Sequence, residues 1–244
     1  IALLKFIIAS ELLFINLKLY KKDSCEVTFD DYNQMYRLFI NGEDYMSYRI
    51  KDHDEAYELY SHYDLAKGHC ICTGLGFGLR ENWLLTKKEV SKVTVVEKNK
   101  EVIDYHKYIN PKFFDDVEVI HMDAYEYTGK CDTLLLDHYE EEAANDMLVL
   151  QNASEISKHI ECDTMWMWTL ERIVAGRSWQ RSCKVGSYVS KTLIYNEIKT
   201  RFDLDKLPDL SEEQLELYYF MYNSKATSVH KHFYEDGNAL SFLK

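Results

Sequence analysis

The stretch HCICTGLGFG, residues 69–78, decides the fold of this chain. Its first half, residues 69–73, is a short apolar run of the kind that forms a buried strand. Its second half places glycines at 74, 76 and 78, where the backbone can turn tightly and approach a ligand closely. A helix to about residue 88 is expected next, with unpaired N–H groups in its first turn. The stretch therefore predicts a strand, a binding loop and a helix.

Strands and helices alternate after this stretch. Apolar runs predict strands at 92–97, 117–121, 132–137 and 163–168, and helices are expected at 99–108 and 140–159. Near-continuous apolar strands separated by helices are typical of a parallel sheet that is covered on both faces. We therefore predict an α/β fold with a Rossmann-like, doubly wound and mostly parallel sheet.

Both flanks of this core carry other patterns. Short alternating runs at 24–50, with a hairpin turn at Asn41-Gly42, predict a small antiparallel sheet. The segment 52–64 predicts a helix, 170–225 a mostly helical insertion, and 228–243 a C-terminal antiparallel hairpin.

These patterns divide the chain into two expected units. The first, 1–66, is an N-terminal helix and strand element, and the second, 67–244, is the Rossmann-like domain with its helical insertion. Residues 1–20 are apolar but carry Lys5, Glu11 and Lys18. We interpret them as an element that docks on the domain, with a targeting or membrane segment as the alternative.

The net charge and the cysteines limit the kinds of binding partner that are expected. The net charge is −12, from 41 acidic and 29 basic residues. A polyanion is bound by clustered Lys and Arg, so no nucleic-acid partner is expected, although a local basic patch is compatible with this total. Six cysteines without a C-x-x-C pair are interpreted as small buried hydrophobes. We expect no metal site, no membrane partner and a cytoplasmic location.

Three acidic residues follow the predicted strands. Glu97 ends the second strand, Asp123 follows the third and Asp137 ends the fourth. The carboxyl ends of parallel strands meet at the ligand-binding edge of such a sheet. We expect Glu97 to accept hydrogen bonds from ribose hydroxyls, Asp123 to accept from an exocyclic adenine amine, and Asp137 to lie nearest the reacting group. The alternative is that these acids only cap the helices that follow.

The glycine spacing distinguishes two kinds of nucleotide site. The dinucleotide pattern G-x-G-x-x-G needs a small residue at position 79, and Leu79 stands there. The spacing G-x-G-x-G resembles motif I of the class I S-adenosylmethionine-dependent methyltransferases. Over about 24–170 the chain is most similar to their spermidine-synthase-like branch, on Asp54-Glu55, Glu97 and Asp123-Ala124.

The resemblance implies S-adenosyl-L-methionine as the cofactor and assigns the site residues. The implied cofactor-binding residues are Thr73, Gly74, Leu75, Gly76, Gly78, Glu97, Lys98, Asp123, Ala124 and Asp137. The resemblance implies a catalytic acid at Asp137 and a second acid on the substrate side at Glu140. We also expect Tyr139 to be catalytic and His138 to line the acceptor pocket beside it, with simple packing of the loop as the alternative for both.

Two departures place the chain between methyl and aminopropyl transfer. Phe77 stands where the polyamine synthases carry an aspartate that holds the donor's amine. Cys72 stands where typical methyltransferases carry an acid. We expect a transferase that methylates a small-molecule acceptor, with an amine as one candidate. Aminopropyl transfer, a nucleotide-binding oxidoreductase and a non-catalytic domain of the same fold are the alternatives. The oligomeric state is left open, with a homodimer as one option.

Overall fold

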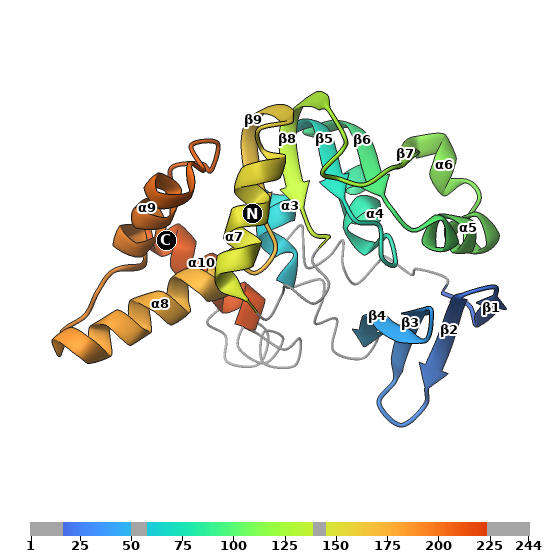
Figure 1. Cartoon of the computed structure of the whole chain (residues 1–244), viewed down its shortest axis with the longest axis horizontal. Helices are drawn as coiled ribbons and strands as arrows, with labels where there is room; N and C mark the ends of the chain where they lie inside the picture. Colours follow the sequence, from blue (N-terminus) through green and yellow to red (C-terminus); the bar gives the residue numbers. More distant parts are fainter. Residues whose placement is uncertain (1–16, 50–57, 139–144, 224–244) are drawn as a thin grey trace.

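The structure is a computed structural model that describes residues 17–49, 58–138 and 145–223 (Figure 1). Its centre is a five-stranded parallel sheet. The strands are β5 (Gly68–Thr73), β6 (Val90–Glu97), β7 (Val117–His121), β8 (Gly129–Leu136) and β9 (Ile160–Met167). Their order is β7-β6-β5-β8-β9. The chain moves from β5 to one edge and then returns to build the other edge, so the direction switches between β5 and β8. The predicted α/β, Rossmann-like fold is confirmed.

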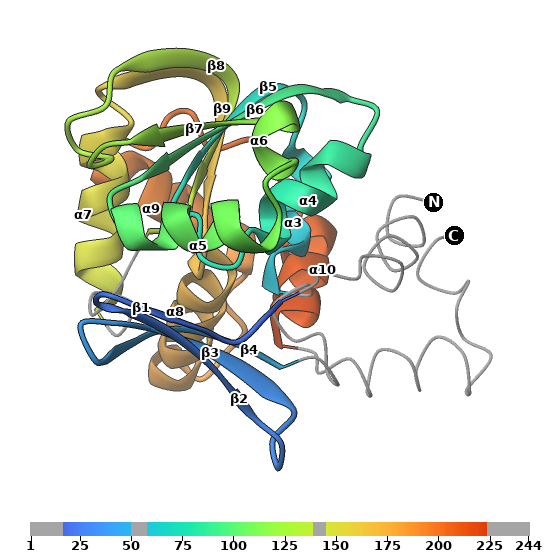
Figure 2. The ribbon, with the colours of Figure 1, turned by 90° about the vertical axis from the view of Figure 1, so that its right-hand side faces the viewer.

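Helices cover both faces of the sheet, and further helices make up the segment after β9. Those beside the sheet are α3 (Tyr60–Leu65), α4 (Leu79–Thr86), α5 (Lys100–Ile109), α6 (Phe113–Asp116) and α7 (Asp146–Ile156). Figure 2 shows α7 on one side of the sheet and α3 and α4 on the other. The expected helical segment contains α8 (Leu170–Val185), α9 (Lys191–Phe202) and α10 (Glu212–Asn223), which pack on one another.

A separate antiparallel sheet precedes this core. It contains β1 (Tyr20–Lys22), β2 (Cys25–Asp30), β3 (Met35–Ile40) and β4 (Glu43–Arg49), in that order. The predicted hairpin turn joins β3 to β4, with φ of 55° at Asn41 and 84° at Gly42. Positive φ at both central residues is the geometry that favours an Asn-Gly turn.

One apolar core connects the two sheets. Leu38 of the small sheet and Tyr105 of α5 are both fully buried and belong to the same cluster as the central strands. The Tyr105 hydroxyl donates to the Lys18 carbonyl at 3.2 Å, and α5 contacts β2. These contacts hold β4 close to the carboxyl edge of the parallel sheet.

Two predicted strands begin three residues earlier than expected. β8 and β9 were expected from 132 and 163, but they begin at Gly129 and Ile160. The early residues are polar because they alternate with buried ones, and Lys130 pairs with Glu161 across the two strands at 2.8 Å. A polar strand end of this kind has the same composition as a loop.

Several expectations fall outside the described residues. They are the N-terminal element over 1–16, the first part of the helix expected at 52–64 and the C-terminal hairpin at 228–243. The division of the chain at residue 66 into two units stays a prediction.

Candidate functional site

The glycine loop lies where β5 ends and α4 begins, at the switch point of the sheet. Gly74, Gly76 and Gly78 all have positive φ, at 76°, 49° and 70°. A Cβ at Gly74 would lie 2.2 Å from the Asp137 carbonyl oxygen, so the loop after β8 packs directly on this glycine. Only glycine combines this backbone conformation with such a close approach.

Glu97, at the end of β6, faces this loop. Its side chain is 1% exposed. Oε2 accepts from the Leu75 N–H at 2.8 Å, and Oε1 accepts from the Asn99 N–H at 2.7 Å and from the Tyr45 hydroxyl at 3.5 Å. Burial raises the pKa of this carboxyl, while the two backbone donors act against the rise. The predicted juxtaposition of the strand-end acid and the glycine loop is present.

A pocket opens beside Glu97. Five predicted cofactor-binding residues line it: Gly74, Glu97, Lys98, Asp123 and Ala124. The other lining residues are Tyr45, Val96, Tyr125, His138 and Asn152. The pocket therefore brings together the ends of β5, β6, β7 and β8, as the sequence analysis expected. Its volume is about 50 Å³, which is room for one or two water molecules.

Strand β4 of the small sheet covers this edge. Met46 lies over Gly76, where its Sδ would be 2.4 Å from an added Cβ. The Phe77 N–H donates to the same sulfur at 3.2 Å. The Tyr45 hydroxyl reaches Glu97. Tyr45 lines the pocket and Met46 covers the loop, so a ligand larger than one or two waters needs side chains of β4 to shift.

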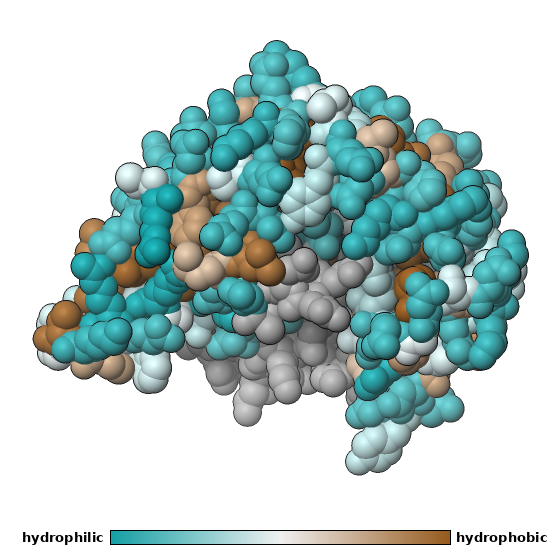
Figure 3. Space-filling view, viewed as in Figure 1, coloured by the Kyte–Doolittle hydropathy of each residue, from teal (hydrophilic) through white to brown (hydrophobic). Residues whose placement is uncertain are grey.

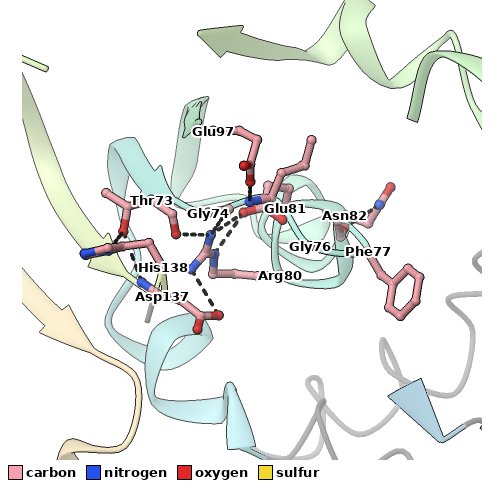
Figure 4. Close-up of polar contacts among 12 residues, drawn as sticks. Thr73, Gly74, Gly76, Phe77, Arg80, Glu81, Asn82, Glu97, Asp137 and His138 are labelled. Atoms are coloured by element: carbon pink, nitrogen blue, oxygen red, sulfur yellow. Dashed lines mark hydrogen bonds and ion pairs between the residues drawn. The ribbon is translucent and has the colours of Figure 1, made fainter. Parts of the chain in front are cut away.

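Asp137 lies on the other side of the glycine loop from Glu97 (Figure 4). Its N–H donates to Thr73 Oγ1 at 3.1 Å, and Thr73 Oγ1 also lies 2.7 Å from His138 Nδ1. The threonine thus ties the end of β5 to the end of β8. The Asp137 side chain is 28% exposed, and its Oδ2 lies 3.5 Å from Arg80 Nη1.

Burial raises the pKa of Asp137 to about 6, since the attraction of Arg80 offsets only part of the desolvation and the nearby Glu81 adds to the rise. This carboxyl is therefore mostly ionised at neutral pH and changes its charge just below it.

Arg80 is a buried cation that the sequence analysis did not identify. Its Nη2 donates to the Gly74 carbonyl at 2.7 Å and to the Thr73 carbonyl at 3.2 Å. Nε and Nη2 both donate to Glu81 Oε1. Figure 4 shows the guanidinium between the loop and Asp137. The available signal was an adjacent Arg-Glu pair in the first turn after the glycines, a place where charges are usually solvated.

His106 of α5 packs against the glycine loop, and the sequence analysis did not identify it either. The ring is buried, and its Nε2 lies 2.9 Å from the Gly76 carbonyl oxygen. Because a carbonyl only accepts, Nε2 carries the proton. Burial lowers the pKa of this imidazole to about 4, so it is neutral. A Cβ at Gly78 would lie 2.7 Å from the same ring.

The remaining predicted residues lie as follows. The Leu75 side chain is buried and contributes its N–H to Glu97. Phe77 is fully buried, so its ring belongs to the core and not to the pocket. Asp123 accepts from the Tyr125 N–H at 2.9 Å. Tyr139 and Glu140 lie outside the described residues.

Features of two other kinds of site are absent from the described part of the chain. No helix there is both long and apolar enough to cross a membrane. No three His, Cys, Asp or Glu side chains gather there as metal ligands would.

Comparison with known proteins finds solved structures with a similar fold. No protein-family model and no curated protein matches the chain. Similar solved structures include spermidine synthase from Thermotoga maritima, with 15% identity and a TM-score of 0.43 over 59% of this chain and 53% of that one. A putative RNA methyltransferase from Pyrococcus horikoshii has 19% identity and a TM-score of 0.42 over 72% of this chain and 79% of that one.

A third similar structure is Trm5b from Pyrococcus abyssi, with 14% identity and a TM-score of 0.40 over 68% of this chain and 48% of that one. The chain therefore spans about half the length of the spermidine synthase and Trm5b chains.

Proposed function

We propose that the carboxyl edge of the parallel sheet binds S-adenosylmethionine and that the chain transfers its methyl group to a small acceptor. The observation that carries this proposal is the position of Glu97, buried against the loop amide of Leu75 and on the same pocket wall as Asp123. A charged group is rarely buried at such an edge without a ligand or partner to compensate it.

The hydrogen-bonding capacity of Glu97 fits a ribose. An ionised carboxylate has about four acceptor sites. Two backbone N–H groups and the Tyr45 hydroxyl use three of them. The Tyr45 contact is the longest of the three, at 3.5 Å, so this phenol is the donor that gives way most easily. Its departure leaves one acceptor site on each oxygen, which is what two adjacent hydroxyls need.

The other residues divide into donor and acceptor sides. Gly74 and Ala124 offer backbone and little bulk at the pocket wall, and Asp123 offers a carboxylate to an exocyclic amine. S-adenosylmethionine supplies a methyl group that its positively charged sulfur has already activated. The chain therefore has mainly to orient the acceptor and exclude water, and such positioning accounts for much of the rate of a bimolecular reaction.

Asp137 is the residue assigned to the acceptor. With a pKa of about 6, its carboxylate can hold an ammonium or accept a proton from an amine or hydroxyl near neutral pH. Arg80, 3.5 Å away, favours the ionised form. We expect activity to rise with pH through about 6 as Asp137 ionises.

Aminopropyl transfer is the second candidate. The spermidine-synthase-like glycine loop and the strand-end acids support it, but the position of the donor-holding aspartate carries Phe77, whose ring is buried in the core. Methyl transfer requires no acid there, and it is therefore preferred.

Calorimetry with S-adenosylhomocysteine and methylthioadenosine tests the proposal. We expect the longer thioether to bind more tightly, and Glu97→Gln to weaken its binding by about 1–3 kcal/mol through lost charge-assisted hydrogen bonds. Glu118→Gln, on the neighbouring strand and about half exposed, is the matched control. Preference for methylthioadenosine would support aminopropyl transfer, and binding of NADH alone would support an oxidoreductase. If none of these ligands binds at millimolar concentration, the site is not an adenosyl site.

A further inference from the structure

A groove between α8 and α9 concentrates positive charge on an acidic protein. Residues 170–202 contain seven Lys and Arg against two Glu, a charge of +5, although the whole chain carries −12. The groove has a volume of about 560 Å³. We call it the basic groove, and its lining residues are Arg177, Gln180, Arg181, Lys184, Val185, Ile194, Glu197, Ile198 and Arg201.

Most of this charge is not neutralised within the described residues. Glu197, the single acid of the lining, pairs with Arg181 at 2.6 Å. No carboxylate in the described part of the chain pairs with Arg177, Lys184 or Arg201. Three cations therefore face one groove without a carboxylate paired to them, and their mutual repulsion is unfavourable unless an anion is bound.

The spacing of the cations suits a chain of phosphates. Arg177, Arg181 and Lys184 are separated by four and three residues, so they share one face of α8 and are about 6 Å and 4.5 Å apart along the helix axis. Arg201 adds a fourth cation from α9. Arginine, which binds phosphate oxygens in a bidentate way, supplies three of the four.

The rest of the hairpin gives the groove an apolar floor. Ile194 and Ile198 form an apolar floor between the cations. Trp179 and Tyr188, on the same α8–α9 hairpin, are 69% and 67% exposed. Neither ring lines the groove, because position 179 lies on the face of α8 opposite Arg177 and Lys184 and the Tyr188 hydroxyl donates to Glu212. The row of cations along α8 therefore carries the choice of a nucleic acid. In Figure 3 hydrophobic and hydrophilic residues lie side by side at the lower left, where Figure 1 shows the end of α8.

The groove also begins near the candidate site. Arg177 contacts Met147, in the first turn of α7, through Nη2 and Sδ at 3.4 Å. The neighbouring Arg172 pairs with Asp146 at 3.1 Å. The first turn of α7 lies at the carboxyl edge of the sheet, because α7 follows β8. A strand lying in the groove therefore runs toward that edge.

We infer that the basic groove between α8 and α9 binds single-stranded nucleic acid. The net charge of the chain had argued against such a partner, but the charges are segregated and the groove presents the opposite sign. This inference does not depend on the proposed transfer reaction.

The test is fluorescence anisotropy with a labelled oligouridylate of about 12 nucleotides, which lies within the about 4–16 nucleotides that a single-strand-binding OB-fold covers. We expect micromolar binding that weakens about 16-fold between about 50 mM and about 200 mM salt, since three phosphate contacts on a single strand give a logarithmic slope near −2. Arg177→Ala, Lys184→Ala and Arg201→Ala combined should remove most of this salt dependence and weaken binding at least tenfold.

A matched triple variant controls for total charge. Lys88→Ala, Lys112→Ala and Lys158→Ala remove the same charge from exposed positions outside the groove and should leave affinity within about twofold. Trp179→Ala with Tyr188→Ala, at exposed positions outside the groove lining, should also leave oligouridylate affinity within about twofold. Equal effects of the two lysine and arginine triples, tighter binding of a polyglutamate peptide than of oligouridylate, or no binding at low salt would each overturn the inference. Thermal unfolding of each variant verifies that it is folded.

Discussion

Arg80 is the buried cation on which the geometry of the site depends. It is 4% exposed and contacts two loop carbonyls, Glu81 and Asp137. Replacing one partner of a buried ion pair leaves the other charge without compensation, which costs about 3–5 kcal/mol. We predict this loss of unfolding free energy for Arg80→Met, measured by urea denaturation. Arg37→Met removes an exposed ion pair with Asp44 and should cost less than about 1 kcal/mol. Similar losses for the two variants would contradict the assigned role.

The buried Glu171 should make the free energy of unfolding depend on pH. It is 3% exposed, and its Oε1 accepts from Trp166 Nε1 at 3.0 Å and from the Ser61 hydroxyl. Burial raises its pKa to about 7. Because the folded state binds this proton more tightly than the unfolded state, the stabilisation is complete below about pH 4 and is lost as pH rises through 7.

Glu171→Gln keeps the accepting oxygen and removes the ionisation. We predict that its free energy of unfolding exceeds that of the wild type by up to about 3 kcal/mol at about pH 8. At about pH 4 the two free energies of unfolding should differ little. Urea denaturation at the two pH values measures this, with the exposed Glu155→Gln as control. A difference that does not change with pH would exclude ionisation of Glu171 as its cause.

Single residues differ in how far the sequence predicts them. Glu97 could be identified because it combines a strand end with a preceding glycine loop. Arg80, His106 and Glu171 could not, because charged and polar residues in helices are usually solvated. Their burial depends on which helix faces pack together, and that is decided by contacts between distant parts of the chain.

Among the elements, β4 controls access to the glycine loop. Met46 covers Gly76, and its sulfur accepts from the Phe77 N–H. We predict that Met46→Ala binds S-adenosylhomocysteine several-fold more tightly, because the ligand no longer displaces the thioether from the loop. Calorimetry checks this, with Met35→Ala on the adjacent strand as control. Weaker binding by Met46→Ala alone would mean that the thioether forms part of the binding surface.

The elements themselves follow from local patterns, and their mutual placement does not. Asn41-Gly42 fixed the β3–β4 hairpin, and apolar runs fixed the five parallel strands within a few residues. Nothing in residues 43–49 indicates that they pack on the loop at 74–78. That contact depends on the core shared by the small sheet and α5, which spans residues far apart in the sequence.

At the scale of the whole molecule, the continuous core predicts that the two sheets unfold together. Leu38 is fully buried in the small sheet and shares one apolar cluster with the parallel sheet. All four tryptophans lie between residues 83 and 179, outside the small sheet. Leu38→Ala should cost about 2–5 kcal/mol. Since one core connects the sheets, the unfolding midpoint of this variant should be lowered by the same amount whether it is followed by tryptophan fluorescence or by far-ultraviolet circular dichroism. Tyr32→Ala, at an exposed turn, should move neither. An unchanged fluorescence midpoint, with an early partial loss of circular dichroism, would instead show that residues 1–66 unfold as an independent unit.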